Sequence, residues 1–279
     1  MLNRKMHFYN KYAPLVAALL FLAGCSGSSG GGSELSGNDN TTADAESVEL
    51  EVTERVFIAP QEVHVMAVGD SITHGVPVPV PSASWRLPFT LSLNEDGCLF
   101  EMVGSQSTNE GHSALVSPHE SYSAHQAGHF ITGFTNYAGT NDGIFSSTAT
   151  YSPDVVLLHI GTNDAVQEQD NQETLQEIDQ IITTILDTDS DVLVANIIPT
   201  FTEDHLDGVD ARIMELGSMI EAYVAQLANP DVIMVDVRSG FTQDLMYDDG
   251  IHPNDRGSEH IADAFYDAFT ANGYCTVGI

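Results

Sequence analysis

The sequence predicts an α/β fold, a three-layer α/β/α sandwich built on a five-stranded parallel sheet. Short apolar segments alternate along the chain with longer segments of helical periodicity, which is typical of parallel strands joined by crossover helices. Segment 154–161 is apolar without polar alternation, which indicates a strand covered on both faces. The five expected strands are residues 63–68, 98–104, 154–161, 191–198 and 232–237.

The expected helices lie between and after these strands, at residues 84–93, 174–186, 209–228 and 256–272. Pro88 falls in the first turn of the first helix, where its missing amide hydrogen costs nothing. Alternating Val and Pro at 76–81 predict a stiff extended insertion. Segment 105–152 has little periodicity and is rich in Gly, Ser, Asn, His and Tyr, so we expect a long functional loop with one short helix at 124–132.

Residues 1–24 have the pattern of an export signal. Three basic residues precede the apolar run 13–22, which is too short to span a membrane. The four residues 22–25, Leu-Ala-Gly-Cys, resemble the bacterial lipobox, and this resemblance implies cleavage before Cys25 and lipidation of that cysteine. We therefore expect an exported, membrane-anchored bacterial lipoprotein on the periplasmic or cell-surface side. The alternative is an ordinary secreted protein with a chance cysteine.

The remaining chain divides by composition into a tether and one domain. Residues 25–47 are mostly Gly, Ser, Asn, Asp and Thr and are expected to be a flexible tether, whereas 48–279 has the length and apolar content of one domain. Without the three basic residues of the signal, the chain keeps 5 basic and 40 acidic residues, a net charge of 5 minus 40, or −35. Such a charge excludes nucleic acid as an expected partner and leaves the lipid anchor as the only expected membrane contact.

The first candidate catalytic residue is Ser71. The strand at 63–68 stops at Gly69, and Asp70 and Ser71 follow at the point where strand gives way to helix. Parallel sheets keep their chemistry at this edge, and the free amides of the next helix would face a negative charge forming beside the serine oxygen. Ser71 is therefore the candidate nucleophile. The alternative is that Ser71 only caps the following helix.

The second candidate pair lies between the last strand and the last helix. In the loop 248–254, Asp249 and His252 are three residues apart, so the carboxylate can hold one ring nitrogen while the other faces outward. A serine nucleophile needs such a base and orienting acid. The alternative is a surface histidine that happens to lie beside acidic residues.

Asn163 follows the strand at 154–161 directly, in the sequence Gly-Thr-Asn-Asp. A side-chain amide at this edge can donate a hydrogen bond to a developing oxyanion, and removing one such donor typically costs about two to three powers of ten in rate. The alternative is an asparagine that only stabilises a turn.

Three blocks of sequence together resemble the SGNH or GDSL hydrolase superfamily. They are residues 69–72 (Gly-Asp-Ser-Ile), 161–164 (Gly-Thr-Asn-Asp) and 249–253 (Asp-Gly-Ile-His-Pro), in the family's order and each after an expected strand. The resemblance implies a flavodoxin-like fold and carboxylic ester hydrolysis. It implies that Ser71 is the nucleophile, His252 the general base and acid, and Asp249 the orienting acid.

The same resemblance implies an oxyanion hole with three donors. Two are the amide of Ser71 and Nδ2 of Asn163. The third is normally the amide of a glycine in a second block, but the best match here, Glu-Ser-Tyr-Ser-Ala-His at 120–125, has Ala124 in its place. An alanine amide donates equally well if its backbone angles suit. Gly111 and Gly128 are the other candidates.

Weaker motifs suggest the substrate class. Residues 84–86, 100–105 and 119–120 look most like carbohydrate esterases that remove acetyl groups from plant polysaccharides. The segment between Gly104 and Ser152 contains no Lys or Arg, which suits neutral, hydroxylated substrates rather than phosphates. We therefore expect a serine esterase that removes O-acetyl groups from a polysaccharide, or acts on a small ester, without a metal or other cofactor.

Alternatives from the same and from other classes remain open. A lipase or lysophospholipase would act on acyl lipids, and a non-catalytic surface lipoprotein would only bind glycan. A metal-dependent hydrolase would gather Asp70, Asn163, Asp164, Asp248, Asp249 and His252 around a cation. Separately, Cys98 and Cys275 would form a disulfide in an exported protein if they meet, or else remain two buried thiols.

Overall fold

The computed structural model describes residues 61–75, 84–107, 117–202, 206–275 and 277. All of them belong to one compact unit of the chain, Val56–Ile279. The expected signal peptide, the tether, the extended insertion at 76–81 and Gly111 lie outside the described residues. Within the part that is described, no helix has both the length and the apolar content needed to cross a membrane.

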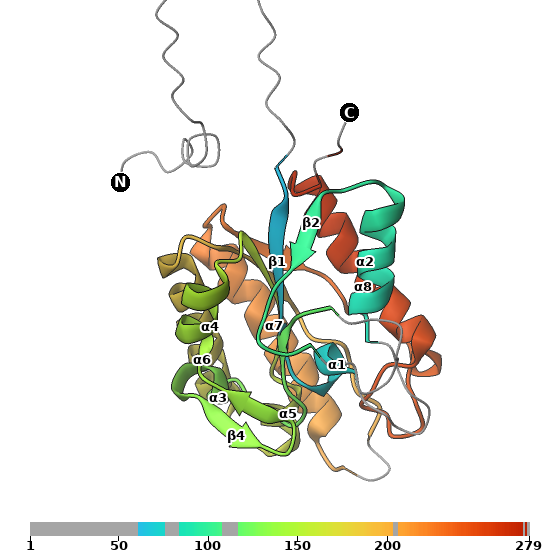
Figure 1. Cartoon of the computed structure of the whole chain (residues 1–279). Helices are drawn as coiled ribbons and strands as arrows, with labels where there is room; N and C mark the ends of the chain where they lie inside the picture. Colours follow the sequence, from blue (N-terminus) through green and yellow to red (C-terminus); the bar gives the residue numbers. More distant parts are fainter. Residues whose placement is uncertain (1–60, 76–83, 108–116, 203–205, 276, 278–279) are drawn as a thin grey trace, which may run out of the picture. The chain divides into compact units, whose positions relative to one another are not determined.

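A parallel sheet forms the centre of the unit (Figure 1). Its strands follow the order β2-β1-β6-β7-β8, and every neighbouring pair is parallel. A sixth short strand, β3, pairs with β1 beyond the end of β2, with Val68 opposite Glu120. The bounds are β1 (Val63–Gly69), β2 (Phe100–Met102), β3 (Glu120–Ser121), β6 (Val155–His159), β7 (Asp191–Ala195) and β8 (Val232–Val235).

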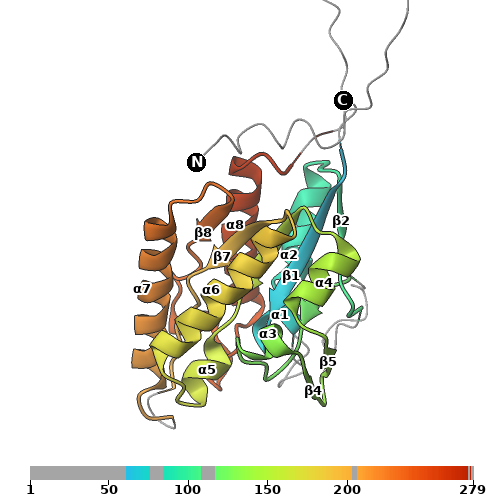
Figure 2. The ribbon, with the colours of Figure 1, turned by 90° about the vertical axis from the view of Figure 1, so that its left-hand side faces the viewer.

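Helices cover both faces of the sheet (Figure 2). Alternate residues of β1 enter different cores: Val65 packs in one apolar cluster with Phe89 and Phe265, and Met66 in the other with Ile181. The first face carries α2 (Arg86–Glu95) and α8 (Asp255–Ala271), and the second carries α4 (Ile144–Tyr151), α6 (Asn171–Asp187) and α7 (Val209–Leu227). The three-layer α/β/α prediction with a parallel sheet is confirmed.

The prediction for segment 105–152 was incomplete: a short helix does lie within 124–132, but the segment also contains strands and a second helix that were not predicted. The structure forms β3 there, then α3 (His129–Thr132), an antiparallel hairpin of β4 (Phe134–Asn136) and β5 (Gly139–Asn141), and α4. These elements are short, and side-chain hydrogen bonds and packing stabilise them rather than an apolar period. The remaining short elements are α1 (Ser71–His74), α5 (Thr162–Val166) and the 3-10 helix η1 (Gln243–Leu245).

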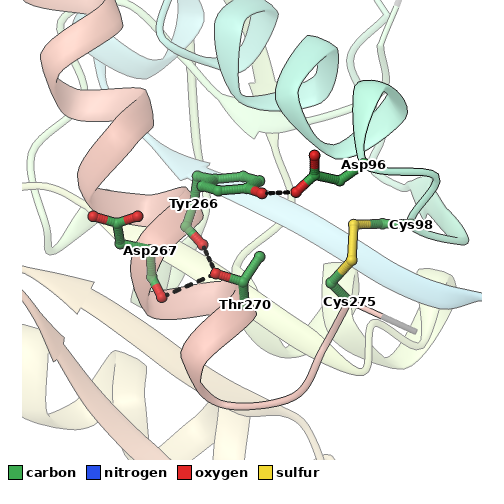
Figure 3. Close-up of a disulfide and its surroundings, with 6 residues drawn as sticks. All are labelled: Asp96, Cys98, Tyr266, Asp267, Thr270 and Cys275. Carbon is green, nitrogen blue, oxygen red and sulfur yellow. Dashed lines mark hydrogen bonds between the residues drawn. A yellow bond between two sulfur atoms is a disulfide. The ribbon is translucent and has the colours of Figure 1, made fainter. Parts of the chain in front are cut away.

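A disulfide joins Cys98 and Cys275, which are 177 positions apart in sequence and 4.9 Å apart between their Cα atoms (Figure 3). This settles the alternative in favour of a bond. Beside it, the Tyr266 hydroxyl of α8 donates a hydrogen bond to Asp96, which follows the end of α2. Both links connect the C-terminal end of α2 with α8 or the residues just after it, so these two helices are fixed against each other.

Candidate active site

The end of β1 positions Ser71. A Cβ atom on Gly69 would lie 2.3 Å from the carbonyl oxygen of His159 on β6, so only glycine fits where the strand ends. Asp70, and not Ser71, caps α1: its Oδ1 accepts a hydrogen bond from the amide of Ile72 at 3.0 Å. Ser71 is the first residue of the helix, and its amide has no acceptor among the described residues. That amide is thus available to an anion.

A continuous hydrogen-bond relay joins the three residues expected to form a triad. Ser71 Oγ lies 2.9 Å from His252 Nε2, and His252 Nδ1 lies 2.7 Å from Asp249 Oδ2. The second carboxylate oxygen, Asp249 Oδ1, accepts from the amides of Ile251 and His252, both at 2.9 Å. The loop therefore fixes its own acid, and the acid fixes the imidazole.

The charge of Asp249 determines the histidine tautomer. Partial burial raises the pKa of Asp249, but hydrogen bonds from the His252 side chain and from the amides of His252 and Ile251 outweigh it and lower this pKa to about 2. Because an ionised carboxylate only accepts hydrogen bonds, Nδ1 of His252 must carry the proton. Nε2 is then left as the acceptor that faces the hydroxyl of Ser71.

Ala124 lies in a tight turn beside the end of β1. The amide of Tyr122 donates to the carbonyl oxygen of Gly69 at 3.0 Å, and the amide of His125 donates back to the carbonyl oxygen of Tyr122 at 3.2 Å. Ala124 is the third residue of this turn and has a φ of 61°, in the left-handed region that glycine favours. Its amide has no acceptor among the residues described, so it remains available as a donor.

Helix α5 fixes the segment that follows this turn. Asn163 Nδ2 donates to the carbonyl oxygen of His125 at 2.9 Å, which leaves the second hydrogen of that amide group free to donate elsewhere. The carboxylate of Asp164 accepts from the amide of Ala127 at 3.1 and 3.2 Å. Burial raises the pKa of Asp164 to about 7. The hydrogen bond from the Ala127 amide lowers this pKa, and the negative charge of nearby Glu177 raises it further.

Of the two other glycines proposed as donors, the structure describes only Gly128. Gly128 precedes α3 with an ordinary right-handed φ of −57°, and a Cβ atom on it would lie 2.5 Å from a side-chain oxygen of Glu177. Gly111 is outside the described residues. Of the two candidates that the structure describes, Ala124 is the one that lies in a turn against the end of β1.

The residues of the metal-dependent alternative are occupied in other ways. Asp70 caps α1, Asp164 holds Ala127, and Asp249 holds His252 and its loop, while Asp248 is exposed. In the described part of the chain, no three His, Cys, Asp or Glu side chains are grouped so that they could hold a metal ion. The burial of Asp70 raises its pKa to about 6, although hydrogen bonding to Ile72 opposes this.

Three buried side chains, Arg86, His74 and His125, contact the segments that carry the candidate site residues, and these contacts were not predicted from the sequence. Arg86 is fully buried and donates to the carbonyl oxygens of Thr73 (2.8 Å), His74 (3.1 Å) and Ser117 (3.0 Å). His74 lies with Nδ1 3.3 Å from Ser123 Oγ, and burial lowers the pKa values of both His74 and His125 to about 4. The motif at 84–86 and the scarcity of basic residues were the available signals for Arg86, but neither predicted these contacts; nothing local indicated the contacts of the two histidines.

Comparison with known proteins places the chain in a family. A family model described as the GDSL-like Lipase/Acylhydrolase family matches residues 67–260, which is most of the chain. The chain therefore belongs to this family and is an ester hydrolase of the SGNH type, as the three blocks of sequence predicted.

Individual relatives are carbohydrate esterases and other esterases. A carbohydrate esterase family 3 structure from Talaromyces cellulolyticus is 25% identical, with a TM-score of 0.61 over 75% of this chain and 97% of that one. The structure of an acetyl esterase mutant with an acetate ion is 25% identical, with a TM-score of 0.59 over 75% and 97%. A "Multidomain esterase" of Ruminococcus flavefaciens is 23% identical over 74% of this chain, which spans only 28% of that protein.

Proposed function

We propose that the chain is a serine esterase in which Ser71, His252 and Asp249 form the catalytic triad. The observation that carries this proposal is the relay from the Ser71 hydroxyl through His252 to Asp249, with links of 2.9 and 2.7 Å. Ser71 Oγ attacks the ester carbonyl carbon while His252 Nε2 takes its proton. Asp249 orients the imidazole of His252 so that Nε2 is unprotonated before this step. The Asp249 carboxylate then stabilises the imidazolium that forms when Nε2 takes the proton.

The negative charge that develops on the carbonyl oxygen needs donors. We assign three hydrogen-bond donors to this oxygen: the backbone amides of Ser71 and Ala124, and the free hydrogen of Asn163 Nδ2. His252 then returns its proton to the leaving alcohol, which departs and leaves an acyl group on Ser71. A water molecule, activated by the same imidazole, releases the acid and restores the serine hydroxyl. No metal or cofactor takes part in these steps.

The substrate class we propose is the O-acetyl groups of a polysaccharide. The 25% identical acetyl esterase and carbohydrate esterase support this class, as does the absence of Lys and Arg between Gly104 and Ser152. A surface without cations suits neutral hydroxylated chains better than phosphates or lipid headgroups. The family's breadth, which includes lipases, makes acyl-lipid hydrolysis the second candidate.

The test is hydrolysis of p-nitrophenyl esters of increasing acyl length, with chelator present, followed by acetylated polysaccharide. We expect preference for acetate, loss of turnover in Ser71→Ala, and unchanged turnover in Ser146→Ala, a matched change on the exposed face of α4. Preference for long acyl chains would favour a lipase. Activity retained by Ser71→Ala would refute the triad, and inhibition by chelator would refute the metal-free mechanism.

We further propose that the protein is exported and held at a membrane through a lipidated Cys25. The basic and apolar start of the chain and the Leu-Ala-Gly-Cys sequence at 22–25 support this. Growth of an expressing bacterium with labelled palmitate tests it: the wild-type chain should carry label, and Cys25→Ala should carry none. Label-free wild type released in soluble form would refute the anchor.

A further inference from the structure

The β4–β5 hairpin reaches the turn that contains Ala124. Asn136, the last residue of β4, donates from Nδ2 to the carbonyl oxygen of Ser123 at 2.9 Å. The orientation of this side chain is fixed, because its Oδ1 accepts the amide of Ala138 at 2.8 Å across the hairpin turn. Figures 1 and 2 both place the hairpin at the end of the sheet that carries α1. A hairpin that was not predicted from the sequence therefore contacts the candidate oxyanion hole.

The bond from Asn136 controls a single peptide unit. The carbonyl group of Ser123 and the amide of Ala124 belong to the same planar trans peptide, so they point in opposite directions. A donor that holds the oxygen on one side thereby aims the Ala124 N–H toward the other side. A 180° rotation of this peptide would exchange the two groups and turn the amide away from the site.

Because residue 124 is an alanine, the rotated orientation of the Ser123–Ala124 peptide competes with the observed one. The turn from Tyr122 to His125 has a positive φ only at Ala124, which is the type II arrangement and favours glycine at this position. Rotation of the Ser123–Ala124 peptide converts type II into type I, in which every residue has a negative φ. For alanine the left-handed conformation is disfavoured by about one order of magnitude or more, whereas glycine adopts both signs of φ about equally.

Other contacts on the turn do not determine this orientation as directly. His74 contacts the Ser123 side chain at 3.3 Å, and Asn163 holds the carbonyl oxygen of His125. Neither acts on the Ser123–Ala124 peptide itself. His125 Nδ1 lies 3.4 Å from the Ser123 carbonyl oxygen and 3.4 Å from Asn136 Nδ2, both longer than the 2.9 Å bond from Asn136.

We propose that Asn136 is a positioning residue that keeps the Ser123–Ala124 peptide turned so that the Ala124 amide faces the oxyanion. Asn136 substitutes for the conformational preference that a glycine at position 124 would supply. The inference rests on the proposed serine mechanism, because the peptide orientation matters for turnover only if this amide stabilises the oxyanion.

The experiment is a double-mutant cycle measured as kcat and KM on p-nitrophenyl acetate. Asn136→Ala should lower kcat about tenfold with KM changed less than about twofold, since the amide is needed in the transition state more than for binding. In the Ala124→Gly background the same change should lower kcat only about twofold, because glycine does not disfavour the required conformation. Thr135→Ala is the matched control: its side chain bonds Thr140 on the exposed side of the same hairpin.

Three results would overturn the inference. Equal losses from Asn136→Ala with Ala and with Gly at position 124 would mean that Asn136 only stabilises the fold. A change confined to KM would place Asn136 in substrate binding, and unchanged kinetics would mean that the peptide stays in place without it. If Asn136→Ala does not fold, Asn136→Asp keeps the acceptor for Ala138 and removes the donor, and the same cycle applies. Turnover retained by Ser71→Ala would instead refute the mechanism on which the inference rests.

Discussion

Replacing Asp164 with asparagine tests the electrostatics of the site through stability. Asp164 is fully buried, and its pKa of about 7 lies well above that of an aspartate in the unfolded chain, about 3.9. Between these two values the folded protein holds a proton that the unfolded chain has released, so the free energy of unfolding falls as pH rises from about 4 to about 7. At about 1.4 kcal/mol per pKa unit, the destabilisation above pH 7 approaches about 4 kcal/mol as an upper limit.

The asparagine side chain in Asp164→Asn would be neutral at every pH and would still offer an oxygen to the amide of Ala127, which bonds the carboxylate at 3.1 Å. We therefore expect this variant to match the wild type near pH 4 and to exceed its stability at pH 8, with the difference growing between pH 4 and 7. Urea unfolding at half-unit pH steps measures it. Glu173→Gln, an exposed change in the first turn of α6, controls for the removal of one negative charge from an acidic chain. A stability difference that is constant across this range would refute the reasoning, as would a less stable variant at pH 8.

Changes at two site residues and at the disulfide provide three more tests. Asn163→Ala should lower kcat on p-nitrophenyl acetate by about two to three powers of ten, since it removes one oxyanion donor; a change of less than about threefold would remove Asn163 from that role. Asp249→Asn should lower kcat by about four powers of ten, because an amide favours the wrong tautomer of His252; near-normal turnover would contradict the orienting role. Cys98→Ser with Cys275→Ser should lower the free energy of unfolding by about 2–5 kcal/mol, measured by urea unfolding, and reductant should destabilise the wild type but not this variant; equal sensitivity of both to reductant would argue against the disulfide.

The architecture was largely readable from local sequence. Each central strand is a short apolar run, and burial of such runs on both faces requires covering helices whatever the details of packing. The five predicted strands and four longer helices all occur, with ends shifted by a few residues. Helix α2 begins at Arg86 rather than at residue 84, because Ser84 has a φ of 53°, which a right-handed helix does not accommodate.

The candidate site was readable for a related reason. Each candidate residue lies in a short motif that comes after a buried strand in the sequence. These residues, Ser71, Asn163, Asp249 and His252, could therefore be predicted before any contact between them was known. Ser71 and His252 are 181 positions apart, yet their side chains lie 2.9 Å from each other. The carboxyl ends of parallel strands lie at the same edge of the sheet, so motifs that follow different strands come close together.

The sequence by itself determined the α/β class, the strand ends that carry the candidate triad, and the family. Only the tertiary structure decided how the turn at residues 122–125 is held, because Asn136 and His74 contact it from segments that are distant in the sequence and that local sequence does not identify. The same holds for the short hairpin and α4, whose stability depends on such contacts rather than on a periodic apolar pattern. Hydrogen bonds from a side chain to the backbone are hard to predict from the sequence, because almost any residue can supply the carbonyl oxygen that accepts them.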